Sequence, residues 1–271
     1  MTLAYTVFQG RAGDHNDLAI PGAKAIGEEL ARRSGIEPDV IGTPEPCLDR
    51  GWREELDAAM PALRQVQQRL SNVFACGSIS IAATSRCAVS LATLPAVAAH
   101  HPGACVVWFD SHGDLNTPDV TTTGYLGGLA LAGPTGLWDS GLGAGIGLDR
   151  IILVGQRDLD PFEIDLIQRH RIAHVRPGSD LGSDLRKAIA GRPVYVHLDC
   201  DVLDPGIVPT DYVHEGGLSL ADLRECCCVI AECDVVGVEI AEFQIAWKLG
   251  GAPVSPAPLL DALAPILESR R

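Results

Sequence analysis

Short β-branched runs alternate along this chain with longer segments of helical periodicity, and this alternation restricts the possible folds more than any other feature. The pattern is typical of βαβ units around a parallel sheet. Eight candidate strands are found at residues 3–8, 38–42, 72–76, 104–110, 150–155, 172–175, 193–199 and 235–243. Candidate helices lie between them, at residues 23–33, 53–70, 88–100, 161–170, 182–190, 220–232 and 258–268. Pro161 suits a helix start, and Ser219 can cap the next helix.

No internal repeat, linker or shift in composition interrupts the 271 residues, so we expect a single domain over residues 1–271. The glycine-rich stretch 124–147 is the best candidate for a long loop or a short helix beside a site. In open parallel sheets, ligands bind beyond the carboxyl ends of the strands. Polar residues at those ends are therefore the first candidates for function.

The formal charge of −14 argues against partners with an anionic surface, because nucleic-acid backbones and acidic membranes attract lysine-rich and arginine-rich patches. The first residues show no secretion signal, and no apolar run is long enough to span a bilayer. Nine cysteines in a chain of this length fit reduced thiols better than a disulfide framework. We therefore expect a cytoplasmic protein that binds a small molecule and neither nucleic acid nor membrane. Its oligomeric state stays open, with a homo-oligomer among the alternatives.

Acidic residues gather where two candidate strands end. One strand runs into Asp110, His112 and Asp114, and another ends in Asp199 and Asp201. Alternate residues of an extended chain point the same way, so each set can converge on one side. Carboxylates gathered without a cation would repel one another, and some would have to take up protons. Divalent cations remove that repulsion, so the two segments predict a metal site.

A single aspartate more often forms a turn or caps a helix, and a lone histidine is more often structural. Five such residues at two strand ends favour a metal centre instead. Carboxylates with one imidazole suit manganese, and they also suit iron, cobalt or zinc. Two clusters favour a pair of metal ions bridged by carboxylates and by a hydroxide, which would serve as the nucleophile of a hydrolase near neutral pH.

The two segments resemble the metal motifs of the ureohydrolase family of arginases, agmatinases and formiminoglutamases. WFDSHGDLNTP is similar to the family's first motif, HLDCDVLDP is similar to its second, and GGLS follows from Gly216 as it does in the family. The resemblance covers roughly residues 73–244. It implies a three-layer α/β/α fold with a central eight-stranded parallel sheet. It also implies hydrolysis of a guanidino C–N bond, with two Mn²⁺ ions as cofactors.

The same resemblance implies a role for each metal-binding residue. Asp110 and Asp199 would bridge the two ions. Asp114 would bind one ion, and His112 with Asp201 would bind the other. Asp114 would also orient the bridging hydroxide.

Substrate contacts are implied in the same way. Glu242 matches a strand-end glutamate that holds the substrate's guanidinium, and a carboxylate can pair with such a planar cation through two hydrogen bonds. The alternative is a solvated charge at a strand end. Asp160 and Glu163 would contact the α-amino group of an amino-acid substrate, and Asn116 with Thr123 would contact its α-carboxylate. Acids at a helix start would explain Asp160 and Glu163 equally well.

The chain departs from the family at the first metal ligand, which is a histidine in Gly-Gly-Asp-His-Ser. One alignment sets CGSIS from Cys76 against this motif and leaves Ile79, which cannot bind a metal, at the ligand position. The other sets the segment 84–88 against it and brings Cys87, 23 residues before Asp110, to that position. We prefer the second, because a thiolate can bind a cation, although this softer ligand would weaken manganese binding at one site. The alternative is an ordinary buried cysteine.

A second departure concerns a histidine that arginases place after Thr-Thr-Ser-Gly-Asn, where it handles protons at the leaving nitrogen. The segment TTTGYLGGL puts Gly127 at that position. The guanidinium of arginine is strongly basic and stays protonated at any physiological pH, so an arginase without this histidine should be slow. A less basic N-hydroxyguanidine would tolerate the loss, and glycine would leave room for its extra hydroxyl.

We therefore expect hydrolysis of Nω-hydroxy-L-arginine to L-ornithine and hydroxyurea, and the altered pattern resembles the arginase-like enzymes that act on this compound in D-cycloserine biosynthesis. Hydrolysis of arginine, agmatine or another guanidino or formimino compound is the close alternative. A non-catalytic relative that serves as a binding partner is the third hypothesis, although the five metal-binding residues and Glu242 all remain.

Overall fold

The computed structural model describes residues 2–268, and its centre is one sheet of eight parallel strands. The strands lie side by side in the order β2-β1-β3-β8-β7-β4-β5-β6. Their bounds are β1 Leu3–Phe8, β2 Asp39–Ile41, β3 Ile79–Ala83, β4 Cys105–Phe109, β5 Ile151–Val154, β6 Ala173–Val175, β7 Val194–Asp199 and β8 Val235–Ala241. The predicted eight-stranded parallel sheet is confirmed.

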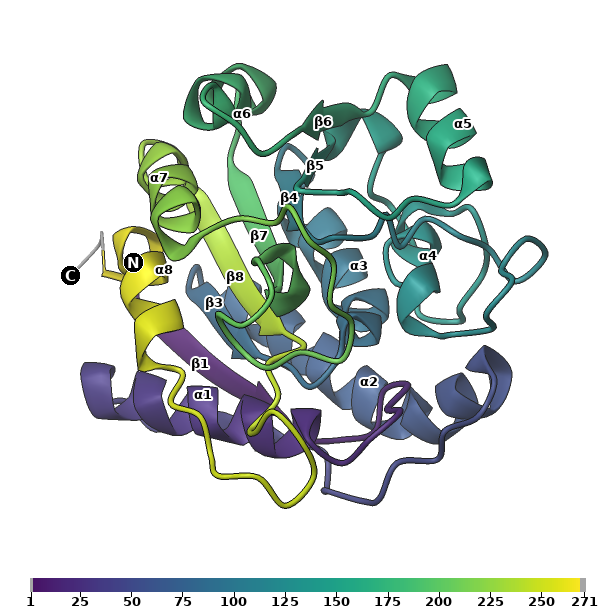
Figure 1. Ribbon diagram of the computed structural model, residues 1–271, viewed down its shortest axis with the longest axis vertical. Coiled ribbons are helices and arrows are strands. Elements are labelled where there is room, and N and C mark those ends of the chain that lie inside the picture. Colours follow the sequence, from purple (N-terminus) through teal and green to yellow (C-terminus); the bar gives the residue numbers. More distant parts are fainter. Residues whose placement is uncertain (1, 269–271) are drawn as a thin grey trace.

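Helices cover both faces of this sheet and complete the three predicted layers (Figure 1). One layer holds α1 Ala19–Ser34, α6 Leu181–Ile189, α7 Leu220–Ile230 and α8 Ala257–Glu268. The other holds α2 Trp52–Ala75, α3 Ser90–His100, α4 Ala132–Thr135 and α5 Pro161–His170. An apolar cluster lies between the sheet and each helix layer. The side chains of β4 alternate between the two clusters: Val107 and Phe109 pack on the side of α1, and Val106 and Trp108 pack on the side of α2.

The two predicted helix starts are confirmed. Pro161 is the first residue of α5, where its missing N–H costs no helical hydrogen bond. Ser219 caps α7, and its Oγ accepts the backbone N–H of Asp222 at 3.1 Å.

The prediction of the third strand was wrong. The apolar run at residues 72–76 belongs to the end of α2, and strand β3 begins later, at Ile79. Buried Val66, Leu70 and Val73 are spaced by four and three residues, so the helical period of α2 continues past the predicted end at Leu70. A short apolar run cannot be told from the end of a buried helix face by its composition.

The four central strands, β3, β8, β7 and β4, are neighbours in the sheet although they are far apart in the sequence. Because all strands are parallel, their carboxyl ends meet at one edge. The glycine-rich stretch 124–147 forms a one-turn helix at Gly127–Leu129 and the short helix α4, as the sequence suggested. Within residues 2–268, no helix has the length and apolar character needed to cross a membrane.

Candidate active site

The predicted metal-binding residues meet at the carboxyl ends of the four central strands. These ends carry Cys87 after β3, Asp110, His112 and Asp114 after β4, Asp199 and Asp201 at the end of β7, and Glu242 after β8. Ligand atoms of Cys87, Asp110 and His197 lie within 4.8 Å of one another, and so do those of Asp110, His112 and Asp201. Asp110 belongs to both groups, as a residue that bridges two ions would. Asp199 instead groups with Cys87 and Glu242, and Asp114 belongs to none of these groups.

Four aspartates of this cluster are buried, with at most 6% of each residue exposed: Asp110, Asp114, Asp199 and Asp201. Burial raises the pKa of Asp110, and the charge of Asp201 adds to the effect. Burial and the charge of Asp110 raise the pKa of Asp114, and burial and the charge of Asp201 raise that of Asp199. The raised pKa values reflect burial and mutual repulsion of the carboxylates, which divalent cations would relieve, so the donor set fits such ions.

His112 lies against two of the carboxylates. Its Nδ1 is 3.1 Å from Oδ1 of Asp110 and 3.1 Å from Oδ2 of Asp201. Burial opposes a charged imidazole, but these two hydrogen bonds outweigh it and raise the pKa of His112. Burial also opposes a charged Asp201, whose pKa is nevertheless lowered by His112 and by the backbone N–H of Ser111. A cation bound at Nδ1 would take the place of the imidazole proton.

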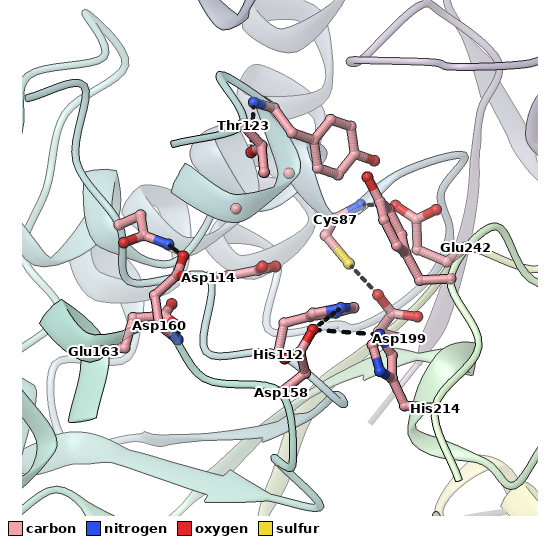
Figure 2. A pocket seen from close by; sticks show the side chains of 15 residues that line it. Cys87, His112, Asp114, Thr123, Asp158, Asp160, Glu163, Asp199, His214 and Glu242 are labelled. Carbon is pink, nitrogen blue, oxygen red and sulfur yellow. Dashed lines mark hydrogen bonds and ion pairs between the residues drawn. The ribbon is translucent and has the colours of Figure 1, made fainter. Parts of the chain in front are cut away.

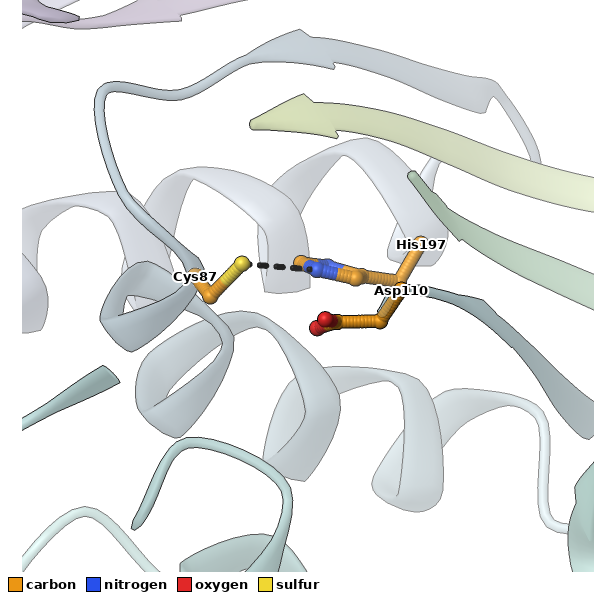
Figure 3. A group of neighbouring side chains, drawn as sticks. All are labelled: Cys87, Asp110 and His197. Atoms are coloured by element: carbon orange, nitrogen blue, oxygen red, sulfur yellow. Dashed lines mark hydrogen bonds between the residues drawn. The ribbon is translucent and has the colours of Figure 1, made fainter. Parts of the chain in front are cut away.

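Cys87 points into the cluster from the short turn that precedes α3 (Figure 3). Its Sγ lies 3.1 Å from Oδ2 of Asp199 and 3.2 Å from Nε2 of His197. Burial and the charge of Asp199 raise the pKa of Cys87 well above its ordinary value. Ile79, the competing candidate, is the first residue of β3 and lies at the other end of that strand. The structure thus brings Cys87, and not Ile79, to the cluster.

His197 was not predicted, and it supports the cluster from within the sheet. Its ring stacks on Trp108 with the centroids 3.5 Å apart, and its Nδ1 is 2.7 Å from Oε1 of Glu239. Nε1 of Trp108 in turn donates to Oδ2 of Asp110 at 3.0 Å. A signal for His197 was present in the sequence, because it lies two residues before Asp199 and alternate strand residues share a face.

Glu242 is buried and paired, which excludes the solvated strand-end charge considered above. Its Oε1 accepts the backbone N–H of Cys87 at 2.9 Å, and its Oε2 lies 2.8 Å from Nη1 of Arg86. The side chain of Arg86 is fully buried and also contacts Asp14 and Asp211. Glu242 has a left-handed backbone with φ +64°, a conformation that is uncommon for residues other than glycine. Arg86 was not predicted from the sequence.

A pocket of about 330 Å³ borders the cluster. The predicted residues that line it are Cys87, His112, Asp114, Asn116, Thr123, Asp160, Glu163, Asp199 and Glu242. Figure 2 shows Asp160 and Glu163 on one side of the pocket, Cys87 and Glu242 on the other, and Asp114 between them. Asp110 and Asp201 are not part of the pocket wall.

Asp160 and Glu163 already have hydrogen-bond partners within the protein. Asn116 donates through Nδ2 to Oδ2 of Asp160 at 2.7 Å, whereas its Oδ1 is buried without a partner among the described residues. Glu163 accepts the backbone N–H groups of Leu115 and Asp160 at 2.9 and 3.0 Å, so it does stabilise the start of α5. Burial raises the pKa of Glu163 to about 7. Thr123 lines the pocket from an exposed position.

The expectation that Gly127 leaves room for a bulkier substrate was wrong. A Cβ atom at this position would lie 2.8 Å from Cζ and 3.1 Å from the hydroxyl of Tyr125, so the phenol fills the space beside the glycine. Tyr125 was not predicted, and neither were Asp158, Tyr212 and His214, which also line the pocket. These residues come from irregular segments, where periodicity carries no signal.

Comparison with known proteins agrees with this geometry. The model of the arginase family matches residues 14–248. The chain is 37% identical over 263 residues to the N(omega)-hydroxy-L-arginine amidinohydrolase of Streptomyces lavendulae, covering 97% of this chain and 96% of that protein.

Solved structures show the same fold at low sequence identity. Arginase from Bacillus subtilis superposes with a TM-score of 0.84 at 17% identity, over 99% of both chains. Arginase from Entamoeba histolytica in complex with L-ornithine has a TM-score of 0.84 at 20% identity, over 98% of both chains. The three-layer α/β/α architecture is therefore that of the arginases.

Proposed function

This chain belongs to the arginase family, and from that membership we propose that it hydrolyses Nω-hydroxy-L-arginine. Water adds to the guanidino carbon, the bond from this carbon to Nε breaks, and Nε takes up a proton and leaves as the side-chain amine of L-ornithine, while the carbon leaves in hydroxyurea. The observation that carries the proposal is the wall around Gly127, where a phenol stands in place of the imidazole that arginases use. The relative from Streptomyces lavendulae is named for the same substrate.

The cofactors in this proposal are two Mn²⁺ ions. Asp110 and Asp199 would bridge them, with Cys87 and Asp114 at one ion and His112 and Asp201 at the other. When bound, the ions would lower the pKa of water and so supply a nucleophile near neutral pH. Support comes from the buried aspartates, whose mutual repulsion a cation would relieve. Cys87 would have to lose its thiol proton in order to bind, so metal affinity would rise with pH.

The guanidino end of the substrate would lie beside Glu242, and Asp114 would orient the attacking water. Because Arg86 already pairs with Oε2 of Glu242, the substrate would share this carboxylate with a fixed cation. An N-hydroxyguanidine is less basic, and its neutral form meets less repulsion there than the guanidinium of arginine, which stays charged at any physiological pH. The ion pair therefore favours the less basic substrate.

The amino-acid end would lie on the opposite side of the pocket, beside Asp160 and Glu163 (Figure 2). Thr123 would contact the α-carboxylate. The unpartnered Oδ1 of Asn116 is an acceptor and suits the α-ammonium group, whereas its donor Nδ2 is engaged by Asp160. Asn116 would thus contact the α-amino group, in place of the contact with the α-carboxylate that the resemblance implied.

A substrate comparison tests the proposal. Manganese-loaded protein is incubated with Nω-hydroxy-L-arginine, L-arginine or agmatine, and ornithine, hydroxyurea and urea are quantified by chromatography. We expect kcat/KM for the hydroxylated substrate to exceed that for arginine by at least about tenfold. Urea released from arginine as readily as hydroxyurea from the hydroxylated compound would contradict the assigned substrate. A protein that retains no metal and hydrolyses none of the three would support a non-catalytic role.

A further inference from the structure

A buried hydroxyl faces the guanidino end of the pocket without a partner. The Oη atom of Tyr125 is buried and has no hydrogen-bond partner among residues 2–268, although Tyr125 lines the pocket together with Glu242 and Cys87. Buried hydroxyls in folded proteins nearly always have a partner. We therefore look for the partner of this one in the molecule that fills the pocket.

The ring of Tyr125 is held in a defined position. It stacks on His15 with the ring centroids 4.4 Å apart, and it contacts the ring of Tyr212 at 5.8 Å. On another side it packs against Gly127, where a Cβ atom would lie 2.8 Å from Cζ of the ring. Its backbone N–H donates to Oγ1 of Thr123 at 3.2 Å. A ring fixed in this way presents its hydroxyl to a ligand without losing further conformational freedom.

A second unpartnered polar atom lies toward the other end of the pocket, where Oδ1 of Asn116 is buried beside Asp160. The pocket therefore offers a free polar atom to each end of an extended, polar ligand. At the guanidino end, arginine carries N–H donors and no acceptor. An N-hydroxyguanidine carries a hydroxyl as well, which both donates and accepts, and the same is true of a phenol.

We propose that the hydroxyl of Tyr125 forms a hydrogen bond with the N-hydroxyl group of the substrate and thereby selects the hydroxylated guanidine over the unmodified one, an inference that rests on the proposed function. The selection comes from a hydrogen bond and not from space beside Gly127. Burial raises the pKa of Tyr125, so the phenol stays neutral and acts as a binding group and not as a proton acceptor. With an unmodified guanidine the phenol would remain unpaired, and a site of this kind discriminates against the ligand that lacks the hydroxyl.

The product pair hydroxyurea and urea tests this contact, because the two differ only in the N-hydroxyl group. Their inhibition constants are measured against hydrolysis of Nω-hydroxy-L-arginine by the manganese-loaded wild type and by Tyr125→Phe. We expect the wild type to bind hydroxyurea more tightly than urea, and Tyr125→Phe to reduce that preference about threefold to tenfold, the loss of one hydrogen bond. An unchanged preference in a folded Tyr125→Phe variant would overturn the proposal.

Tyr212→Phe is the matched control. Tyr212 lines the same pocket, but its hydroxyl already lies 3.4 Å from Nε2 of His15. This change should alter the binding of hydroxyurea and urea by the same factor. If Tyr212→Phe loses the preference for hydroxyurea and Tyr125→Phe keeps it, the contact belongs to Tyr212 and the proposal is overturned.

A pair of glycine variants tests the contact without touching the hydroxyl itself. Gly127→Ala forces the ring of Tyr125 to move, whereas a Cβ atom at Gly128 meets no atom within 4 Å. We expect Gly127→Ala to lower the preference for hydroxyurea and Gly128→Ala to keep it. If the wild type releases no hydroxyurea from Nω-hydroxy-L-arginine, the proposed function and this inference fall together. If the wild type does release hydroxyurea, and the preference survives both Tyr125→Phe and Gly127→Ala, then only the proposed role of Tyr125 is refuted and the proposed function stands.

Discussion

Arg86 and Glu242 form a buried ion pair at the wall of the pocket, with Nη1 2.8 Å from Oε2. The side chain of Arg86 is fully buried and also contacts Asp14 and Asp211, so one guanidinium joins three carboxylates from distant parts of the chain. Glu242 directly follows β8 and has a left-handed backbone conformation. Removal of one member would leave the others buried and uncompensated.

Replacement of Arg86 by methionine should therefore destabilise the protein by about 3–5 kcal/mol, the usual cost of breaking a buried ion pair from one side. Urea-induced unfolding followed by circular dichroism measures the free energy of unfolding. Arg32→Met is the control, because Arg32 pairs with Glu29 at the surface of α1 and its loss should not produce a resolvable change. Equal midpoints for wild type and Arg86→Met would show that the ion pair does not stabilise the fold.

Cys87→Ser should weaken metal binding at one of the two sites by more than about tenfold, because serine does not readily supply an anionic ligand. Metal content after dialysis against graded chelator concentrations measures the two affinities. Co²⁺ provides a second measurement, since a thiolate ligand gives a charge-transfer absorption that should be absent from the variant. Cys200→Ser is the control, as Cys200 is buried next to Asp199 but belongs to the apolar cluster on the other face of the sheet. Two metals held with unchanged affinity in Cys87→Ser would exclude the thiol as a ligand.

Much of the fold was predictable because buried strands and amphipathic helices have different periods. In β4, alternate residues belong to the two apolar clusters, and the abrupt change from Phe109 to Asp110 marks the strand end. Strand β3 was misplaced for a physical reason as well. Its sequence ISIAA contains small residues, whereas the preceding end of α2 contains the bulkier run NVFA and competes for the assignment.

The proposed metal ligands could be predicted because they occur at spacings of two residues behind two strands, and strand geometry brings such residues together. Arg86 and Tyr125 could not be predicted, since their positions depend on tertiary contacts. Arg86 contacts Asp14 and Asp211, which lie 72 and 125 positions away in the sequence. The ring of Tyr125 stacks on that of His15, which is also distant in the sequence. No local pattern encodes such contacts.

Removal of the metals should destabilise the protein more at high pH than at low pH. The pKa values of Asp110, Asp114 and Asp199 are raised in the folded protein by burial and mutual repulsion, and that of Glu163 is raised to about 7. A folded-state pKa above the unfolded value means that the metal-free protein binds more protons when folded. Its stability is therefore fully present below the unfolded pKa values of about 4 and is lost as the pH rises through the folded ones.

Bound cations would replace those protons, so the melting temperature of manganese-loaded protein should exceed that of chelator-treated protein by a margin that grows between about pH 5.5 and about pH 8. Differential scanning calorimetry at both pH values measures the margin. Ca²⁺ in place of Mn²⁺ shows whether any divalent cation suffices. A margin that shrinks with rising pH would mean that the carboxylates are not the groups that bind the metals.

Gly127→His alone should fail to restore an arginase-like site, because Tyr125 occupies the space that the new side chain needs. A Cβ atom at this position would already lie 2.8 Å from Cζ and 3.1 Å from the hydroxyl of the tyrosine, so we expect a lower melting temperature than that of the wild type. The double variant Gly127→His with Tyr125→Asn replaces the phenol by the asparagine of the arginase segment and makes room for the imidazole.

An added general acid contributes about 10²–10⁴-fold in favourable cases, and its effect should be larger for the more basic leaving group. The ratio of kcat/KM for L-arginine to that for Nω-hydroxy-L-arginine should therefore rise at least about tenfold in the double variant, and Tyr125→Asn alone separates loss of the phenol from gain of the imidazole. A single Gly127→His variant that melts with the wild type and hydrolyses arginine would show that Tyr125 does not guard this position.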